Sequence, residues 1–182
     1  MKKKTIEILP YFLVILAVGL RILAFYKIIN LPPNFAPIGA VALFSGVYLS
    51  RKYAILIPLA VLAISDYFIG FYNIGVLLTV WGSFALIGLF GLYLRKRKNI
   101  ATIITGTLAS SILFFLTTNF AVWAASGWYA KTWSGLGQSY FMALPFFRNT
   151  LLGDLFFVFV LFGSYELVLY LVRNKAYKRK LA

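Results

Sequence analysis

The chain has 182 residues, of which 62% are hydrophobic, 19% aromatic and only 12% charged. Soluble domains carry roughly 25% charged residues and disordered segments have low hydrophobicity, so the composition excludes both classes. The net charge of +14 comes from 18 Lys and Arg against 4 Asp and Glu. The basic residues are separated by apolar runs of membrane length and do not cluster on one soluble face, which argues against nucleic-acid binding. The sequence therefore predicts a multi-pass protein of the cell membrane, with the lipid bilayer as its surroundings.

Cysteine and histidine are both absent. The chain therefore has no disulfide and lacks the commonest general base and metal ligand. It also lacks the phosphate-loop pattern GxxxxGK[ST] and the catalytic patterns HExxH and GxSxG. We expect no enzymatic activity, no cofactor and no metal. An intramembrane enzyme that uses Asp66 and Asp154 as an acid–base pair is the least favoured alternative.

Six apolar segments follow one another along the chain, and we expect each to be a helix. Five are long enough for a spanning helix, which needs about 20 residues. The second is shorter and follows a double proline, so we expect it to begin below the membrane surface, where protein must surround it. The prediction is an all-α, six-transmembrane-helix bundle in a single domain, 1–182, with helices at 8–26, 35–49, 53–71, 74–94, 100–125 and 150–172.

The basic residues predict the orientation. Most of the 18 lie before the first segment, between the second and third, between the fourth and fifth, or after the sixth. Positive charge favours the cytoplasmic side, so the pattern places both termini in the cytoplasm. The excess charge is then an orientation signal, with some attraction to anionic headgroups. Only Arg21, Lys27, Lys131 and Arg148 fall on the outer side.

The connection at 126–149 is predicted to be the longest outer loop, and it is rich in Trp, Tyr and Phe. Aromatic residues favour the headgroup level, so the segment fits an interfacial belt. It also fits a lid or re-entrant segment over a pocket, with its glycines as hinges. The two interpretations are compatible with each other.

Polar residues of the predicted helices gather in one layer near the outer surface. Asp66 and Arg21 each lie about five residues, or roughly 8 Å, from an outer helix end. Buried ionisable groups face the bundle interior, pair with each other or line a cavity. One interpretation is therefore a set of ion pairs drawn from Arg21, Arg148, Asp66 and Asp154.

The other interpretation is a small-molecule site, because aromatic walls with a few convergent polar groups are typical of such sites. The aromatic side chains would stack on the solute. Asp66 and Asp154 would accept hydrogen bonds or meet positive charge, and Lys131 or Arg148 would hold a carboxylate or phosphate. The candidate binding residues are Asn34, Asp66, Asn119, Trp123, Tyr129, Lys131, Arg148, Asn149 and Asp154.

Two further patterns predict structure more than function. Glu166 lies near the inner surface, where we expect it to pair with a basic loop residue or to snorkel. Small residues three or four apart, as in Ala42/Gly46 and Gly88-x-x-Gly91, indicate close packing between helices.

Four segments carry a resemblance to known proteins: PPNFAPIGAVALFSG at 32–46, SDYFIGFY at 65–72, TTNFAVW at 117–123 and PFFRNTLLGD at 145–154. Together they resemble an uncharacterised prokaryotic family of integral membrane proteins that are described as candidate transporters. That family is similar in architecture to the substrate-binding S components of energy-coupling factor (ECF) transporters. The resemblance implies six helices, both termini inside and a site near the outer surface. It also implies separate ATP-hydrolysing and transmembrane coupling subunits.

One departure concerns the partner. S components often carry an Ala-x-x-x-Ala pattern on the first helix for docking, whereas here Ala17 and Ala24 are seven apart. A protein that works alone or with a different partner therefore stays open.

The favoured hypothesis is a small-solute binding and uptake protein, such as the substrate-specific component of a transporter for a vitamin-like molecule or small heterocycle, with its site on the extracytoplasmic side. The alternative is a structural or morphogenetic membrane protein without a ligand, similar in size and topology to the cell-shape protein MreD. These alternatives differ in whether the outer polar layer lines a cavity or consists only of ion pairs.

Overall fold

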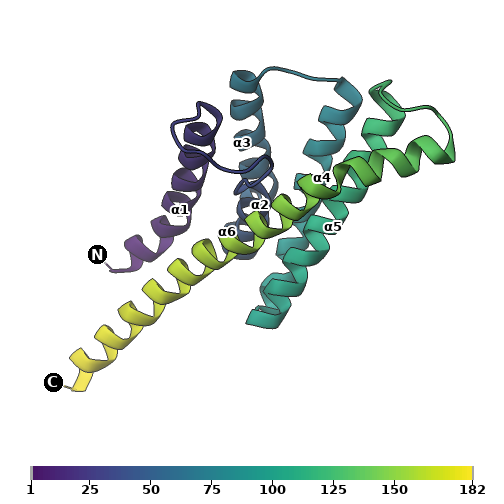
Figure 1. The fold of residues 1–182 in the computed structure, drawn as a ribbon. Coiled ribbons are helices and arrows are strands. Elements are labelled where there is room, and N and C mark those ends of the chain that lie inside the picture. The colour runs from purple at the N-terminus through teal and green to yellow at the C-terminus, as the bar shows by residue number, and fades with distance from the viewer. Residues whose placement is uncertain (1, 182) are drawn as a thin grey trace.

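The computed structural model describes residues 2–181, which form an all-α arrangement (Figure 1). The predictions of an all-α fold and of six helices are confirmed for these residues. Four of the helices are long and apolar enough to cross a membrane, and two are shorter and apolar, so the chain is a multi-pass membrane protein. The elements are α1 (Lys2–Phe25), α2 (Ile38–Tyr48), α3 (Tyr53–Ile69), α4 (Ile74–Leu94), the short 3-10 helix η1 (Arg95–Arg97), α5 (Ile100–Ala125) and α6 (Trp133–Leu181).

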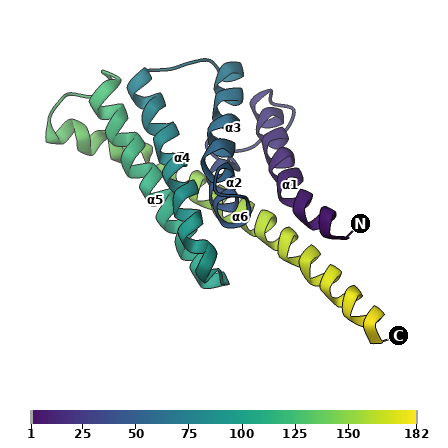
Figure 2. The same cartoon turned by 180° about the vertical axis from the view of Figure 1, so that it is seen from behind.

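The structure differs most from the sequence prediction at 126–149. Only residues 126–132 form a connection, because α6 begins at Trp133 and continues for 49 residues. At 1.5 Å per residue α6 is about 74 Å long, more than twice the roughly 30 Å hydrocarbon core. Its first turns run at a shallower slope than the rest in Figures 1 and 2. Pro145 lies inside the helix and removes one backbone donor, which is a common cause of such a change of direction.

The short helix α2 lies at the centre of the bundle. Every residue from Ile38 to Val47 is buried, and α2 packs against α4, α3 and α6 (Figure 1). Its 11 residues are only about 16 Å long, too short to cross a membrane. That α2 is shorter than the other apolar helices agrees with the predicted short second segment.

The closest helix packing is between α2 and α4. A side-chain carbon added at Gly46 would collide with the backbone of Gly88 and Gly91. One added at Gly88 would collide with the carbonyl oxygen of Ala54 at the start of α3. The small residues thus let three backbones meet, which confirms the predicted packing role of Ala42/Gly46 and Gly88-x-x-Gly91 within the chain.

The end of α2 that follows Gly46 is surrounded by charged and aromatic groups. Arg95 donates to the carbonyl oxygen of Gly46 and to that of Leu49, so a positive charge satisfies the last carbonyls of α2. Glu166 forms an ion pair of 2.8 Å with Lys98 and accepts a hydrogen bond of 2.6 Å from Tyr48. The predicted pairing of Glu166 with a basic loop residue is confirmed.

Candidate functional site

A cavity of about 400 Å³ lies between the second half of α5 and the first part of α6. This volume falls within the range of ligand pockets, roughly 300–1,000 Å³. Three of the predicted site residues line it: Asn34, Asn119 and Tyr129. The remaining lining residues are Phe114, Phe115, Thr118, Val122, Trp128, Ser139, Met142, Ala143, Phe146, Phe147 and Thr150.

Helical periodicity positions the lining residues. On α5 they recur at 114, 115, 118, 119 and 122, and on α6 at 139, 142, 143, 146, 147 and 150. Both sets are spaced as one face of an α-helix, so two facing stripes form the walls. The rings of Phe115 and Phe147 meet across the helices with centroids 4.5 Å apart. The cavity therefore depends on α6 beginning at Trp133, ahead of the predicted sixth segment.

The polar side chains in these walls are tied to backbone carbonyls. Asn119 Nδ2 donates to Phe115 (2.8 Å), Thr118 Oγ1 to Phe114 (2.7 Å) and Thr150 Oγ1 to Phe146 (3.0 Å), each four residues back on its own helix. Ser139 Oγ donates across to the carbonyl of Asn119 (2.9 Å), which joins α6 to α5. These bonds fix the side chains in place.

The loop before α2 closes one edge of the cavity. Asn34 has a positive φ of 64°, a left-handed conformation that Asn tolerates better than most residues. Asn149 Nδ2 donates to the carbonyl of Pro33 at 3.0 Å, which ties this loop to α6. Asn149 thus acts on the loop that presents Asn34 and does not itself line the cavity.

The other predicted aromatic and basic residues hold the 126–132 connection together. Trp123 Nε1 donates to the carbonyl of Ala130 at 2.9 Å. Lys131 donates to the carbonyl of Trp123, and its Nζ lies 5.7 Å from the centre of the Trp123 ring. Both residues, and the exposed Arg148, lie outside the cavity lining.

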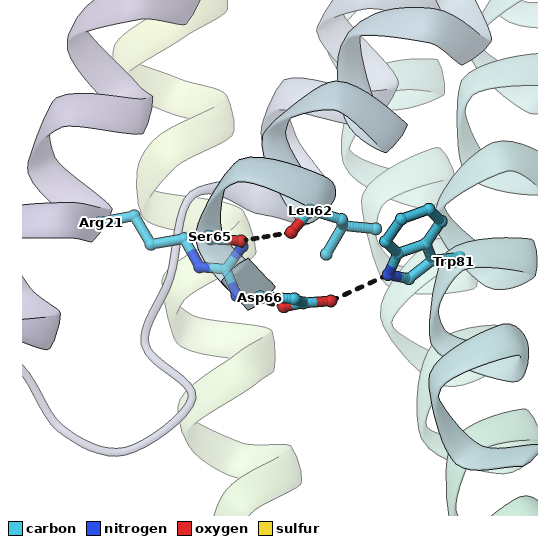
Figure 3. Close-up of polar contacts among 5 residues, drawn as sticks. All are labelled: Arg21, Leu62, Ser65, Asp66 and Trp81. Atoms are coloured by element: carbon cyan, nitrogen blue, oxygen red, sulfur yellow. Dashed lines mark hydrogen bonds and ion pairs between the residues drawn. The ribbon is translucent and has the colours of Figure 1, made fainter. Parts of the chain in front are cut away.

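Asp66 belongs to a separate network that joins three helices (Figure 3). It accepts a hydrogen bond of 2.8 Å from Trp81 Nε1 of α4 and lies 3.9 Å from the guanidinium of Arg21 of α1. Arg21 also donates to Ser65, which in turn donates to the carbonyl of Leu62. With only 2% of its surface exposed, Asp66 is a buried, paired carboxylate. This matches the ion-pair interpretation for Arg21 and Asp66.

The hydroxyl of Tyr72, in the connection after α3, lies close to the same pair. Burial and the Asp66 carboxylate raise the pKa of Tyr72 to about 12. Tyr72 is therefore neutral at physiological pH and adds no charge to the network.

Replacing Trp81 by phenylalanine tests whether this network is structural. The change keeps the aromatic volume but removes the hydrogen bond to a buried carboxylate, which contributes about 1.5–3 kcal/mol. We expect the midpoint of thermal unfolding of the purified protein to fall by roughly 5 °C. Trp133, which is 88% exposed, provides the matched control Trp133→Phe with no measurable change. An unchanged midpoint for Trp81→Phe would contradict a structural role for Asp66.

Asp154 has a different partner from the one that the ion-pair interpretation assigns. Asp154 is 5% exposed, and its carboxylate accepts a hydrogen bond of 2.7 Å from Ser111 Oγ. Gly39 is in the first turn of α2, whose N-cap residue Pro37 makes no side-chain cap. The carboxylate of Asp154 lies against this turn at Gly39, so a negative group from α6 faces the N-terminal end of α2. A side-chain carbon at Gly39 would collide with this carboxylate, so glycine is needed there.

The nine predicted residues thus separate into groups. Only Asn34, Asn119 and Tyr129 meet at the cavity, whereas Asp66 and Asp154 fix helices. Sequence reasoning missed the phenylalanines and Ser139, Met142 and Thr150. The lining residues on α6 could have been found from their helical spacing between 139 and 150. Predicting a loop at 126–149 removes this signal, because no helical spacing is then expected there.

Residues 2–178 match the model of a family described as "Family of unknown function (DUF6580)". A search of curated proteins and a search of solved structures each find no match. The family match covers almost the whole chain and carries no statement of activity.

Proposed function

The chain belongs to the DUF6580 family, and we propose that it is a membrane protein that binds a small solute in the cavity between α5 and α6 and takes part in its uptake. The observation that carries the proposal is the cavity itself. It has the volume, the aromatic walls and the few fixed polar groups that are usual for a small-molecule site.

The distribution of charge supports access from outside the cell. One basic run, Arg51–Lys52, directly precedes α3. A second, Arg95–Lys98, directly follows α4. Both termini point to the lower side of Figure 1, whereas the 126–132 connection, beside the cavity, lies at its upper side. By the positive-inside rule, both termini are cytoplasmic and the cavity opens to the outer side.

The chain has no phosphate-binding loop, so it would not itself hydrolyse ATP by that route. The resemblance to S components suggests ATP-hydrolysing and transmembrane coupling subunits as partners. Co-purification from the native membrane distinguishes such a complex from a protein that works alone.

Filling the cavity tests the proposal. We expect a library of vitamins, nucleobases and amines to contain a compound that raises the unfolding temperature of the purified protein. Ala143→Trp places an indole among the lining residues and should abolish this rise. Ala124→Trp, at an exposed position of α5 outside the lining, is the matched control and should retain it.

Two outcomes would contradict solute binding. One is a library in which no compound shifts the wild-type protein. The other is a shift that Ala143→Trp leaves intact, because the ligand would then bind elsewhere.

A structural role without a ligand is the second candidate, and a specific observation favours it. Asp66 and Asp154, the carboxylates that are buried among the side chains that the structure describes, are both engaged in contacts between helices. A library without hits, together with loss of cell-shape control on deletion of the protein, would support this candidate.

A further inference from the structure

The polar side chains in the cavity walls all act as hydrogen-bond donors to the backbone. Asn119, Thr118, Thr150 and Ser139 each donate their hydrogen to a backbone carbonyl. A hydroxyl has one hydrogen, so the three hydroxyl oxygens keep only acceptor capacity. The amide of Asn119 keeps its Oδ1 as an acceptor in addition to its second N–H. The helical walls therefore offer mainly acceptors to a bound molecule.

The remaining wall surface is aromatic and lacks positive charge. Phe114, Phe115, Phe146 and Phe147 line the cavity from α5 and α6, and Trp128 and Tyr129 from the connection. Among the residues that the structure describes, no Lys or Arg belongs to this lining. Faces of aromatic rings attract cations and polarised N–H groups. A carboxylate or phosphate would meet oxygen lone pairs and ring faces with no cation to pair with, which is unfavourable.

We propose, on the basis of the proposed function, that the cavity selects solutes that present N–H donors on a flat or apolar body, such as organic amines and amides, and rejects anions. A primary ammonium has three N–H groups, which donate to Asn119 Oδ1 and to the hydroxyl oxygens of Thr118 and Thr150, and a primary amide donates its two N–H groups to two of these acceptors. The body of the solute stacks between the phenylalanines of α5 and α6. This differs from the sequence expectation that Lys131 or Arg148 would hold a carboxylate or phosphate.

The rim has a different character from the walls. Asn34 and Trp128 are exposed and carry N–H donors, and Tyr129 is half-buried with a hydroxyl that donates or accepts. These groups can meet an acceptor at the outer end of the solute. The deep polar contacts, which lie between two helices, set the selectivity against anions.

Three probes with one ring system separate charge from hydrogen bonding: tryptamine, an ammonium; indole-3-acetamide, a neutral donor; and indole-3-acetate, an anion. Binding to the purified full-length protein is measured by calorimetry. We expect the ammonium and the amide to bind at least about tenfold more tightly than the acetate. Tighter binding of tryptamine than of the amide would assign the extra affinity to the aromatic walls.

A pair of threonine variants tests the wall. Thr118→Val keeps the shape but removes the acceptor, so it should weaken tryptamine binding by about tenfold and reduce its preference over acetate. Thr105→Val is the control, because Thr105 makes the same type of bond to its own helix but is exposed and outside the lining. A purely structural role of Thr118 would change the unfolding temperature without changing the preference.

The possible outcomes distinguish this proposal from the one on which it rests. Selection for donors is wrong if the acetate binds as tightly as the amine. It is also wrong if the library compounds whose binding is abolished by Ala143→Trp are carboxylates or phosphates. In both cases solute binding itself stands. If the library ligands are amines or amides, selection is supported even where the indole probes are too large. If no compound binds at all, both proposals fail.

Discussion

Replacing Asp154 by alanine is expected to lower the midpoint of thermal unfolding by roughly 10 °C. The carboxylate lies against the first turn of α2 at Gly39, and α2 is buried from Ile38 to Val47. Without it, the N–H groups in the first turn of α2 lose the nearest acceptor at a place that is buried. A buried unpaired donor costs about 1–3 kcal/mol, and the loss of a favourable charge at a helix N-terminus adds to this cost.

Ser111 limits the damage, because its hydroxyl also lies 3.1 Å from the carbonyl of Thr107 and can donate there instead. We therefore expect the total loss for Asp154→Ala to be about 2–4 kcal/mol. At roughly 2–4 °C per kcal/mol for a chain of this size, the shift is readily measured by fluorescence or circular dichroism in detergent.

Two variants show whether the effect belongs to the cap. Asp154→Asn keeps an acceptor oxygen and should cost about half as much. Glu166→Gln alters an acid on the same helix whose side chain is 48% exposed, so it should change the midpoint little. Equal midpoints for the wild type and Asp154→Ala would show that Asp154 does not hold α2, which would return it to the list of candidate ligand contacts.

The helices could be predicted from the sequence because long apolar runs leave few alternatives in a membrane. The bounds of α4 and α5 match the predicted segments, and α2 is short for the expected reason. The start of α6 could not be predicted in the same way. Residues 133–149 contain glycines, polar residues and Pro145, which locally favour a loop, and only packing against α5 shows that they form a helix.

The candidate site was predictable only in part. The sequence indicates which residues lie near the outer ends of the helices and in the outer connections, and this predicts that Asn34, Asn119 and Tyr129 lie at one level. The direction in which a side chain points depends on how each helix is rotated about its own axis. The depth of a residue gives no information about this rotation. The sequence predicts Asp66 and Asp154 in one layer with the cavity residues, yet Asp66 accepts a hydrogen bond from Trp81 and Asp154 lies against the start of α2. The rotation of the helices therefore places the two carboxylates outside the cavity, although the sequence predicts them in the same layer as the cavity residues.

The second large effect is expected for Gly88→Ala. A methyl group at this position would collide with the carbonyl oxygen of Ala54, and the carbonyl oxygen of Ala42 lies 3.8 Å from it. The obstacle is backbone, so a change of rotamer cannot relieve it and α3 or α4 must move. Overpacking of this kind costs about 1–3 kcal/mol, and here it acts where α2, α3 and α4 meet. We expect the midpoint of thermal unfolding to fall by roughly 5–10 °C.

Gly82→Ala on the same helix is the matched control. No atom lies within 4 Å of the added methyl group at Gly82, and alanine is about 1 kcal/mol better than glycine inside a helix. This variant should therefore be as stable as the wild type or slightly more stable. The two substitutions are chemically identical, so the opposite changes expected in the unfolding midpoint follow from the difference in packing alone. If Gly88→Ala proved as stable as Gly82→Ala, the backbones of α3 and α4 would not be in contact at this position.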